Sequence, residues 1–258
     1  MSKIVSVHSF RGGTGKSNIT ANVASLIAEK GKRTGIIDTD IQSPGIHVIF
    51  GLEEEKMDKS LNDYLWGKCP VEQTAYDVSP ILKMGEGELA VMSGGMYLIP
   101  SSLRAGEIAK VLREGYDVNL LNDGFRELTR KLELDYLFID THPGLNEETL
   151  LSISISDVLL IIMRPDQQDY QGTAVTVDVA RKLDVPCVMM VVNKVLPSYD
   201  FDELQKKVEE TYNVPVAGVL PESDEMLALG SSGVFSLKYP DHRLTRTLRS
   251  IAEQIIAE

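Results

Sequence analysis

The sequence contains few cysteines and no apolar stretch long enough to cross a membrane. Its two cysteines, Cys69 and Cys187, are far apart and form no CxxC pair. They therefore supply no metal or cluster motif and fit a reducing compartment. No apolar run approaches the roughly 20 residues that a spanning helix needs. The first apolar strand begins within the first few residues and leaves no room for a leader segment, so we expect a cytoplasmic protein.

Basic residues are also scarce relative to acidic ones. The chain has 26 Lys and Arg against 38 Asp and Glu, a formal net charge of −12. This balance argues against a surface that binds nucleic acid over its whole extent, while a local basic patch stays open. The 258 residues, 43% hydrophobic and 25% charged, are typical of one large soluble domain. We expect a single domain that spans residues 1–258.

The most informative stretch is a glycine-rich turn near the start of the chain. Residues 9–18, SFRGGTGKSN, lie between an apolar strand at residues 4–7 and a helix that opens at about Ser17, which is the context of a phosphate-binding loop. Glycines let the backbone approach an anion closely, and the N–H groups of the loop and helix then face the phosphates. Lys16 would reach the β- and γ-phosphates, and the Ser17 hydroxyl would bind Mg²⁺. The predicted nucleotide-binding residues here are Gly12, Gly13, Thr14, Gly15, Lys16, Ser17 and Asn18. The alternative is a glycine-rich turn with no ligand.

This loop departs from the usual pattern at two positions. Phe10 stands where the usual spacing has a glycine, and Arg11 directly precedes the paired glycines. A basic residue there resembles the deviant phosphate loop of the MinD/ParA family of ATPases, in which a lysine at this position reaches across a sandwich dimer to the partner's nucleotide. The resemblance implies an ATP-dependent homodimer in which Arg11 and Lys16 are both catalytic. Arginine keeps the charge of that lysine but not its compact shape.

A pair of aspartates follows the second predicted strand. The strand covers residues 33–38, and Asp38-Thr39-Asp40 stands at its end. Ligands of an open parallel sheet bind outside the carboxyl ends of the strands, so both carboxylates should face the phosphates. The following residues 41–45 resemble switch I of the family, which implies that Asp40 orients the attacking water and that Asp38 holds the water shell of the metal. The alternative is a pair of aspartates that cap the end of the strand.

A third signal is the apolar strand at residues 136–140, which ends on Asp140. This pattern is typical of a Walker B strand and predicts Asp140 near the Mg²⁺. Asp-Thr-His-Pro-Gly-Leu, residues 140–145, resembles switch II of the family, although the family has proline where this chain has His142. A histidine there could sense pH or nucleotide state, but a lone histidine in a loop is more often solvated than functional, so we favour a solvated His142.

The remaining pattern predicts an α/β fold. Residues 158–163 and 188–192 are continuous apolar runs, as in strands that are buried on both faces of a parallel sheet, and a helix from about 168 to 183 connects them. Helices are also expected at residues 60–65, at 121–132 and from 201, and strands at 89–92, 96–100 and 216–221. We therefore expect one P-loop NTPase domain, with a mostly parallel twisted sheet and helices on both faces.

Two further positions resemble the part of the family that binds the base. Asn193 follows a central strand where the family carries an asparagine that pairs with adenine, and Pro221 with Glu222 resembles the loop that packs over the base. The resemblance thus adds Asn193 and Pro221 to the predicted nucleotide-binding residues. It covers the chain from end to end and is weakest between about residues 53 and 90.

The last predicted helix has an apolar face and a basic one. Arg243, Arg246 and Arg249 lie on one arc, and in ParA-like proteins a basic patch in this region touches DNA non-specifically. At a net charge of −12 we favour a solvated helix face over a DNA site. The chain closes on acidic residues with no basic amphipathic tail, so we do not expect membrane binding in the manner of MinD.

Taken together, the sequence predicts a Mg²⁺-dependent ATPase that acts as a nucleotide-switched dimer in positioning or partitioning a cellular cargo. ATP and Mg²⁺ are the expected cofactors, and a second copy of the chain and an unidentified protein activator are the expected partners. Three alternatives stay open. One is an ATP-dependent ligase of the dethiobiotin or cobyric-acid type, and another is a nucleotide-gated scaffold with negligible hydrolysis. An iron–sulfur carrier would need clustered cysteines, which this chain lacks.

Overall fold

The computed structural model describes residues 2–84 and 94–258. The predicted strand at residues 89–92 lies outside these residues. The strands of the described part are β1 Lys3–His8, β2 Thr34–Asp38, β3 Tyr76–Asp77, β4 Met96–Ile99, β5 Tyr136–Asp140, β6 Val158–Met163, β7 Cys187–Val195 and β8 Val216–Pro221. The α-helices are α1 Lys16–Glu29, α2 Ile46–Ile49, α3 Leu61–Leu65, α4 Ala105–Glu114, α5 Asn119–Lys131, α6 Glu147–Ser154, α7 Gln167–Lys182, α8 Phe201–Tyr212, α9 Asp224–Leu229, α10 Phe235–Lys238 and α11 Arg243–Ala257.

The described strands form one sheet in the order β3-β4-β2-β5-β1-β6-β7-β8. All neighbouring pairs are parallel except β3 with β4, which are antiparallel at one edge. The registers bring Val7 of β1 and Asp38 of β2 level with Asp140 of β5. The ends of these three strands therefore meet at the same edge, where a ligand of a parallel sheet binds.

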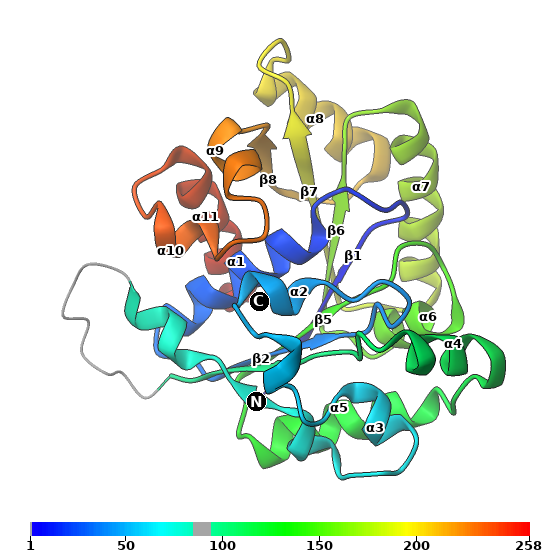
Figure 1. Cartoon of the computed structure of the whole chain (residues 1–258). Helices are drawn as coiled ribbons and strands as arrows, with labels where there is room; N and C mark the ends of the chain where they lie inside the picture. The colour runs from blue at the N-terminus through cyan, green and yellow to red at the C-terminus, as the bar shows by residue number, and fades with distance from the viewer. Residues whose placement is uncertain (1, 85–93) are drawn as a thin grey trace.

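Helices cover both faces of this sheet (Figure 1), as the sequence predicts. Alternate residues of β6 show why. Val158, Leu160 and Ile162 pack with α1 and α11 in one apolar cluster. Leu159, Ile161 and Met163 pack with α7 and α8 in another. A strand with apolar side chains on both sides is stable only between two layers of helices.

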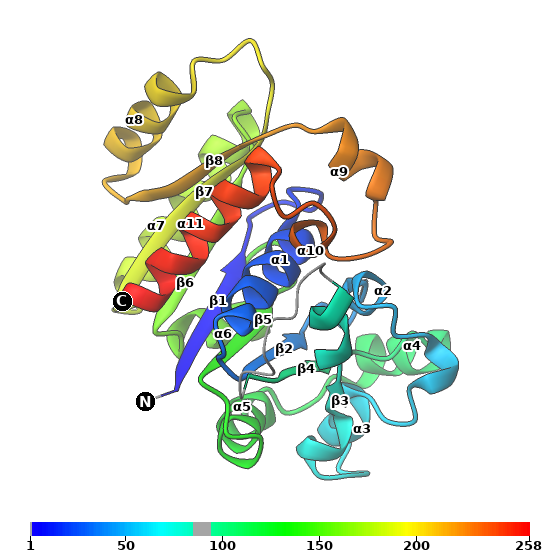
Figure 2. The same ribbon diagram turned by 90° about the vertical axis from the view of Figure 1, so that its left-hand side faces the viewer.

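The helix α1 is almost entirely buried, because it lies between the sheet and α11. Ile19, Val23, Leu26 and Ile27 are at most 4% exposed, and the paired apolar face of α11 is likewise buried. Figure 2 shows both helices in front of the sheet, with the two chain termini near one another at the amino ends of the strands. The helix that follows the phosphate loop is thus held rigidly.

Five of the α-helices, α2, α4, α6, α9 and α10, were not predicted from the sequence. Helix α4 follows β4 at the carboxyl edge of the sheet and has no buried residue, and its Leu112 is 61% exposed. Its apolar residues follow a helical period, but few contacts fix the helix against the sheet. Sequence patterns that rest on burial are weakest for such an element.

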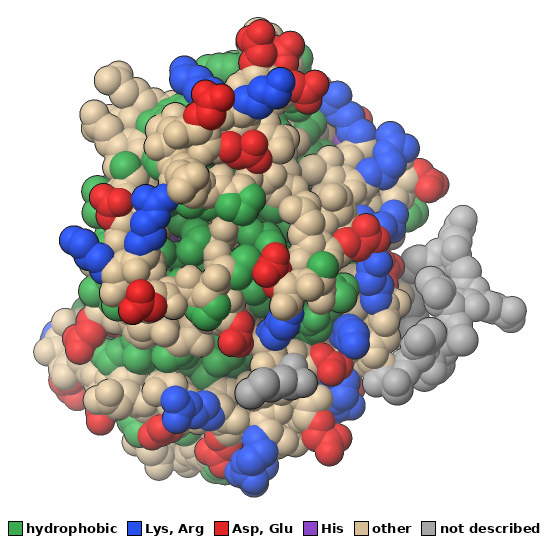
Figure 3. All heavy atoms as spheres, turned by 180° about the vertical axis from the view of Figure 1, so that it is seen from behind, with side chains coloured by type: hydrophobic (Ala, Val, Ile, Leu, Met, Phe, Trp, Pro, Cys, Tyr) green, Lys and Arg blue, Asp and Glu red, His purple; other side chains and the backbone are tan. Residues whose placement is uncertain are grey.

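The rear face of the molecule carries charges of both signs. Figure 3 shows Lys and Arg side chains interleaved with Asp and Glu around the rim, while hydrophobic side chains gather toward the middle. Among the described residues, no helix is both long and apolar enough to cross a membrane.

Candidate functional site

The glycine-rich turn connects β1 to α1 and opens at the carboxyl edge of the sheet. Two of its residues have left-handed backbone conformations, Gly13 with φ 77° and Gly15 with φ 96°, which favour glycine. A Cβ on Gly15 would lie 2.5 Å from Nδ2 of Asn193. The spacing of the glycines is therefore dictated by the turn itself and by the close approach of β7.

Two side chains at the end of β7 hold the turn from outside. Asn193 donates from Nδ2 to the Thr14 carbonyl at 2.8 Å, and Lys194 donates from Nζ to the Gly13 carbonyl at 2.9 Å. These contacts fix the orientation of two successive peptide groups of the turn. Successive N–H groups of such a turn can form an anion site, so the turn is a candidate phosphate-binding loop.

Lys194 was missed by the sequence reasoning. It has φ 57°, a conformation that is uncommon for a residue with a side chain, and the β-strand pattern gave no sign of it. The nearest signal is its position directly after Asn193. The contact with Gly13 depends on a crossover that brings β7 beside the phosphate loop, which a local pattern does not reveal.

Lys16, Ser17 and Asp140 meet at the start of α1. Lys16 is 8% exposed. Thr20 donates its hydroxyl to Asp140 at 3.3 Å, and the Ser17 hydroxyl also hydrogen-bonds to Asp140. Burial raises the pKa of Asp140 to about 6, although the hydrogen bond from Ser17 and the charge of Lys16 oppose this shift. A buried carboxylate whose charge is only partly balanced favours a nearby cation.

Asp38 lies beside Asp140 on the neighbouring strand and is fully buried. Burial, followed by the charges of Asp140 and Asp40, raises the pKa of Asp38 well above its usual value. Its carboxylate accepts the N–H groups of Asp40 at 3.0 Å and Gly45 at 3.1 Å. Asp38 therefore fixes the conformation of the loop that leads away from β2, as well as adding negative charge to the site.

Asp40 faces the second predicted switch loop. Its Oδ1 lies 3.8 Å from Nε2 of His142, and it also accepts the N–H of Ser43 at 3.1 Å. Burial raises the pKa of Asp40, while the charges of His142 and Lys16 lower it. His142 is thus a half-buried neighbour of the predicted water-orienting residue. No sequence pattern indicated this contact, which joins the loops that follow β2 and β5.

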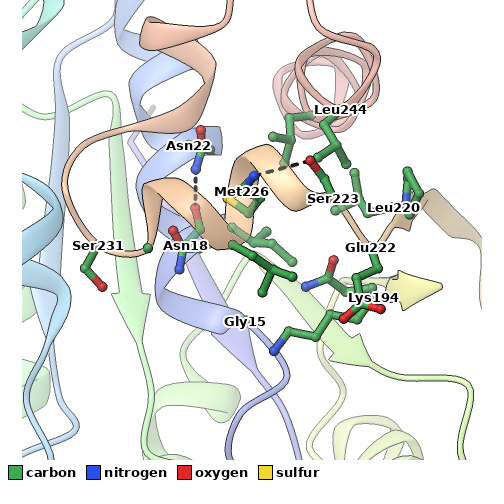
Figure 4. Close-up of a pocket in the computed structure, with 16 residues that line it drawn as sticks. Gly15, Asn18, Asn22, Lys194, Leu220, Glu222, Ser223, Met226, Ser231 and Leu244 are labelled. Carbon is green, nitrogen blue, oxygen red and sulfur yellow. Dashed lines mark hydrogen bonds between the residues drawn. The ribbon is translucent and has the colours of Figure 1, made fainter. Parts of the chain in front are cut away.

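A cavity of about 230 Å³ adjoins the phosphate loop. Figure 4 shows that it lies between α1 and the segment that carries α9 and α11, with Lys194 extending toward the loop at Gly15. Its lining is Gly15, Asn18, Ile19, Asn22, Asn193, Lys194, Leu220, Pro221, Glu222, Ser223, Met226, Leu227, Gly230, Ser231, Leu244 and Leu248. The predicted residues Asn18, Asn193 and Pro221 all belong to it. From the sequence, Leu244 and Leu248 of α11 were expected to be core residues, and Met226 and Leu227 of α9 were not predicted to have a role.

The polar atoms around this cavity and loop fit a nucleotide. Asn18 Oδ1 and Thr14 Oγ1 are buried and have no hydrogen-bond partner within residues 2–84 and 94–258, whereas buried polar atoms are usually satisfied. Asn193 uses its amide nitrogen on the loop, which leaves its Oδ1 to accept a hydrogen bond from a base. The loop, the orphaned atoms and the apolar cavity together can hold a phosphate chain at one end and a planar base at the other.

Arg11 lies away from this cavity, against the N-terminus of α7. Its Nη1 lies 3.2 Å from Asp166 and 3.3 Å from Asp169 of the same chain. All the other predicted site residues lie along the loop, at the ends of β2 and β5, or around the cavity, and only Arg11 is directed elsewhere. This contact joins residues that are far apart in the sequence, and no local pattern indicates it.

Among the described residues, no three His, Cys, Asp or Glu side chains come together as a ready-made metal site. The predicted donors nevertheless fit Mg²⁺, which prefers oxygen ligands and takes several of them from phosphates and water. Ser17 supplies a hydroxyl, and the buried Asp38 and Asp140 supply the negative charge around it.

Comparisons with known proteins agree with this geometry. A family model described as ParA, NUBPL iron-transfer P-loop NTPase, matches residues 1–256. The chain is 28% identical to an uncharacterized ATP-binding protein of Methanocaldococcus jannaschii, over 99% of this chain and 88% of that protein. It is 27% identical to the cytosolic Fe-S cluster assembly factor NUBP2 homolog of Culex quinquefasciatus, over 99% of this chain and 97% of the other.

Two solved structures share the fold. The septum site-determining protein MinD of Pyrococcus horikoshii, complexed with Mg-ADP, matches with a TM-score of 0.78 and 21% identity over 99% of this chain and 96% of that chain. The cell division ATPase MinD of Pyrococcus furiosus matches with a TM-score of 0.81 and 22% identity over 100% of this chain and 99% of the other. The α/β fold expected from the sequence is confirmed.

Proposed function

Because the chain belongs to the ParA family of P-loop NTPases, we propose that it is a Mg²⁺-dependent ATPase of the MinD/ParA type, which acts as a nucleotide-switched dimer in positioning or partitioning a cellular cargo. The observation that carries the proposal is the meeting of Lys16, Asp40 and Asp140 at one edge of the sheet, beside an open cavity for a base. Phosphoryl transfer depends mainly on positioning and charge neutralisation, and these residues supply both.

Binding would use the loop and the cavity together. The N–H groups of the turn and Lys16 hold the phosphates, and the residues around Asn193 and Pro221 enclose the base. Asn193 Oδ1 is an acceptor, which suits the exocyclic amine of adenine. This preference supports ATP as the nucleotide.

Hydrolysis would use the switch loops. Asp40 accepts a hydrogen bond from the water that attacks the γ-phosphate and so orients it. Lys16 balances the charge that develops on the phosphate oxygens. Ser17 and, through its water shell, Asp38 and Asp140 would hold Mg²⁺, which neutralises the β- and γ-phosphate oxygens. The MinD of Pyrococcus horikoshii was solved with Mg-ADP, which supports a nucleotide and Mg²⁺ as the ligands here.

The output would be a change of assembly. In the MinD/ParA reading, Arg11 of one copy meets the nucleotide of a second copy, so that ATP favours the dimer and hydrolysis releases it. The dimer would present a surface to a cargo or to an activating protein. A ligase would instead need a small acid for turnover, and a scaffold would bind ATP without hydrolysing it.

A role in iron–sulfur cluster assembly is the second candidate. The family description and the Culex relative favour it. Against it, Cys69 follows α3 and Cys187 begins β7, and both are free. A cluster bound by this chain would lack the clustered thiolates that such centres use. Incubation of the protein with ferrous iron and sulfide tests this role directly. The sulfide-to-iron charge-transfer absorption of a bound cluster, retained after desalting, would support it, and its absence would count against it.

The main test is ATP turnover by the full chain. We expect hydrolysis that needs Mg²⁺, needs no small acid and disappears in Lys16→Ala. Lys206→Ala, an exposed lysine of α8, is the matched control and should keep full activity. ATP binding without Mg²⁺-dependent hydrolysis, alone or with a second protein, would favour the scaffold.

A further inference from the structure

Arg11 belongs to a network of two arginines and two aspartates at the N-terminus of α7. Arg164 lies 3.1 Å from Asp166 through Nη2 and 3.3 Å from Asp169 through Nε. Arg11 contacts the other oxygen of each aspartate. Both carboxylates are thus shared by both guanidinium groups, and the network is electrically balanced.

The members differ in burial. The Asp169 side chain is 3% exposed, whereas those of Asp166 and Arg11 are 42% and 37% exposed. Asp169 also accepts the backbone N–H of Arg164 at 2.9 Å. Removal of Arg11 alone would therefore leave the buried carboxylate still paired with Arg164. Without Arg164, the departure of Arg11 would leave a buried carboxylate with no cation, which is strongly unfavourable.

Phe10 fixes the backbone beside this network. A Cβ on Gly172 of α7 would lie 2.1 Å from a ring carbon of Phe10, so the phenyl ring occupies the space that the absent side chain leaves. The loop is thereby seated on α7, and the guanidinium of Arg11 can leave its carboxylates by rotation about side-chain bonds alone. Phe10, which stands where the usual loop spacing has a glycine, thus helps to position Arg11 beside Asp166 and Asp169.

We propose that Arg164 is a positioning residue that makes Arg11 releasable: Asp166 and Asp169 hold Arg11 within its own subunit, and Arg164 keeps both carboxylates balanced when Arg11 turns to the phosphates of a second copy. The inference rests on the proposed function, because it assumes that Arg11 acts across a dimer. Phosphate oxygens bind a guanidinium in the same forked manner as carboxylates, so the partner's nucleotide competes directly with Asp166 and Asp169.

Two variants should shift this competition in opposite directions. Asp166→Asn removes one of the carboxylates that hold Arg11, while the asparagine oxygen can still accept the Asp169 N–H that caps α7. Arg164→Gln removes the substitute cation but keeps its backbone N–H to Asp169. We therefore expect ATP-dependent dimerisation to become about three- to tenfold tighter in Asp166→Asn and weaker by a similar factor in Arg164→Gln.

The experiment is sedimentation of the full chain in the Asp40→Ala background, with saturating ATP, with ADP, and with each added substitution. Asp178→Asn is the matched control, since Asp178 is an exposed carboxylate of the same helix that pairs with Arg181; its dimer affinity should equal that of the parent. ATP affinity, measured by calorimetry under dilute monomeric conditions, should be unchanged in all of them. Arg164→Lys should restore most of the affinity that Arg164→Gln loses.

The outcomes separate the two proposals. If the Asp40→Ala parent stays monomeric with ATP, the dimer function fails. If the parent dimerises but Asp166→Asn and Arg164→Gln have the same affinity, or shift it in the same direction, the release role of Arg164 is wrong while the dimer stands. A folded Arg164→Gln protein with unchanged dimer affinity would by itself overturn the inference.

Discussion

The half of the site beside the phosphate loop differs from the half that would hold the base. The first contains Lys16, Asp38, Asp40 and Asp140, all with little exposure, and burial raises the pKa of each of these carboxylates. The second is lined largely by apolar side chains of β8, α9 and α11 and is already open. The first half carries three carboxylates against one lysine, and the second half is a cavity with a largely apolar lining.

This difference indicates where a conformational response should arise. Apolar packing around a base changes little when the base enters, whereas the buried carboxylates change their interactions when a cation and phosphates arrive. The loops that carry Asp40 and His142 follow directly from those carboxylates. We therefore expect affinity to be shared by both halves, and switching to depend on the charged half.

The largest effect is expected from a substitution in the charged half of the site. Lys16→Ala should lower ATP affinity about 100-fold or more, because it removes the buried cation that the phosphates would contact. Inorganic tripolyphosphate should lose affinity equally, since the lost contact does not involve the base. Calorimetry with both ligands measures this, and near-native affinity for either would show that the loop has been misinterpreted.

The next effect separates binding from chemistry within the same half. Asp40→Ala should leave ATP affinity within about threefold of the parent and lower turnover about 100-fold, because a positioned acceptor of the water's hydrogen bond contributes to the transition state. Asp58→Ala, which changes an aspartate outside the site, should retain turnover. Hydrolysis by Asp40→Ala at the parent rate would remove Asp40 from the mechanism.

A smaller effect should mark the base half. Met226→Ala shortens a side chain of α9 that lines the cavity and should weaken ATP binding about fivefold, through lost apolar contact. Tripolyphosphate affinity should stay unchanged, which distinguishes this variant from Lys16→Ala. Leu112→Ala, on the exposed helix α4, is the control. If Met226→Ala weakened the binding of ATP and of tripolyphosphate equally, the two halves of the site would not contribute separately to affinity.

The buried side chain of His8 lies in the charged half of the site, and its protonation state can be tested. Thr141 donates its hydroxyl to the Val7 carbonyl at 3.0 Å, so its oxygen accepts from Nδ1 of His8 at 2.8 Å. The other ring nitrogen, Nε2, is buried and has no hydrogen-bond partner in the part of the chain that the structure describes. Burial, with smaller contributions from Lys16 and His142, lowers the pKa of His8 to about 3.

The sign of the pH dependence follows from this shift. Between its usual pKa of 6.5 and about 3, His8 is protonated in the unfolded chain but not in the folded one, so its contribution to stability falls as the pH falls. The free energy of unfolding of the protein relative to His8→Asn should decrease by about 1.4 kcal/mol per pH unit between pH 6 and 4. Urea unfolding at several pH values measures it, and a constant difference would place a proton on buried His8.

The smallest effect concerns the C-terminal helix. Arg243 and Arg246 are exposed on α11, opposite its buried face. We expect no ATP-dependent retention on non-specific DNA at physiological salt, and no change when Arg243, Arg246 and Arg249 are all replaced by alanine. Tight, steeply salt-dependent retention that the triple variant abolishes would instead make this face a DNA site.

Much of the fold was predictable because burial leaves a periodic signal. The apolar runs of β6 and β7 and the repeated apolar face of α11 all correspond to real elements. The strand-end positions of Asp38 and Asp140 were likewise predictable, since a parallel sheet brings such ends together. Helix α4 was not, because it buries nothing.

The contacts between distant segments were beyond any local pattern. Lys194 reaches Gly13, Arg11 reaches Asp166, and His142 lies beside Asp40 only because crossovers bring their strands together. From the sequence alone, His142 was expected to be solvated, Arg11 was expected to contact the nucleotide of a second copy, and Lys194 was given no role. These contacts lie around the charged half of the site.

The most direct test of the account is the assembly state of Asp40→Ala protein, measured by light scattering with ATP, with ADP and without nucleotide. We predict a dimer with ATP alone, and a return to monomer when Arg11→Ala is added, with ATP affinity nearly unchanged. An Asp40→Ala protein that remains monomeric at saturating ATP, or a double variant that dimerises as well as the single one, would contradict the account.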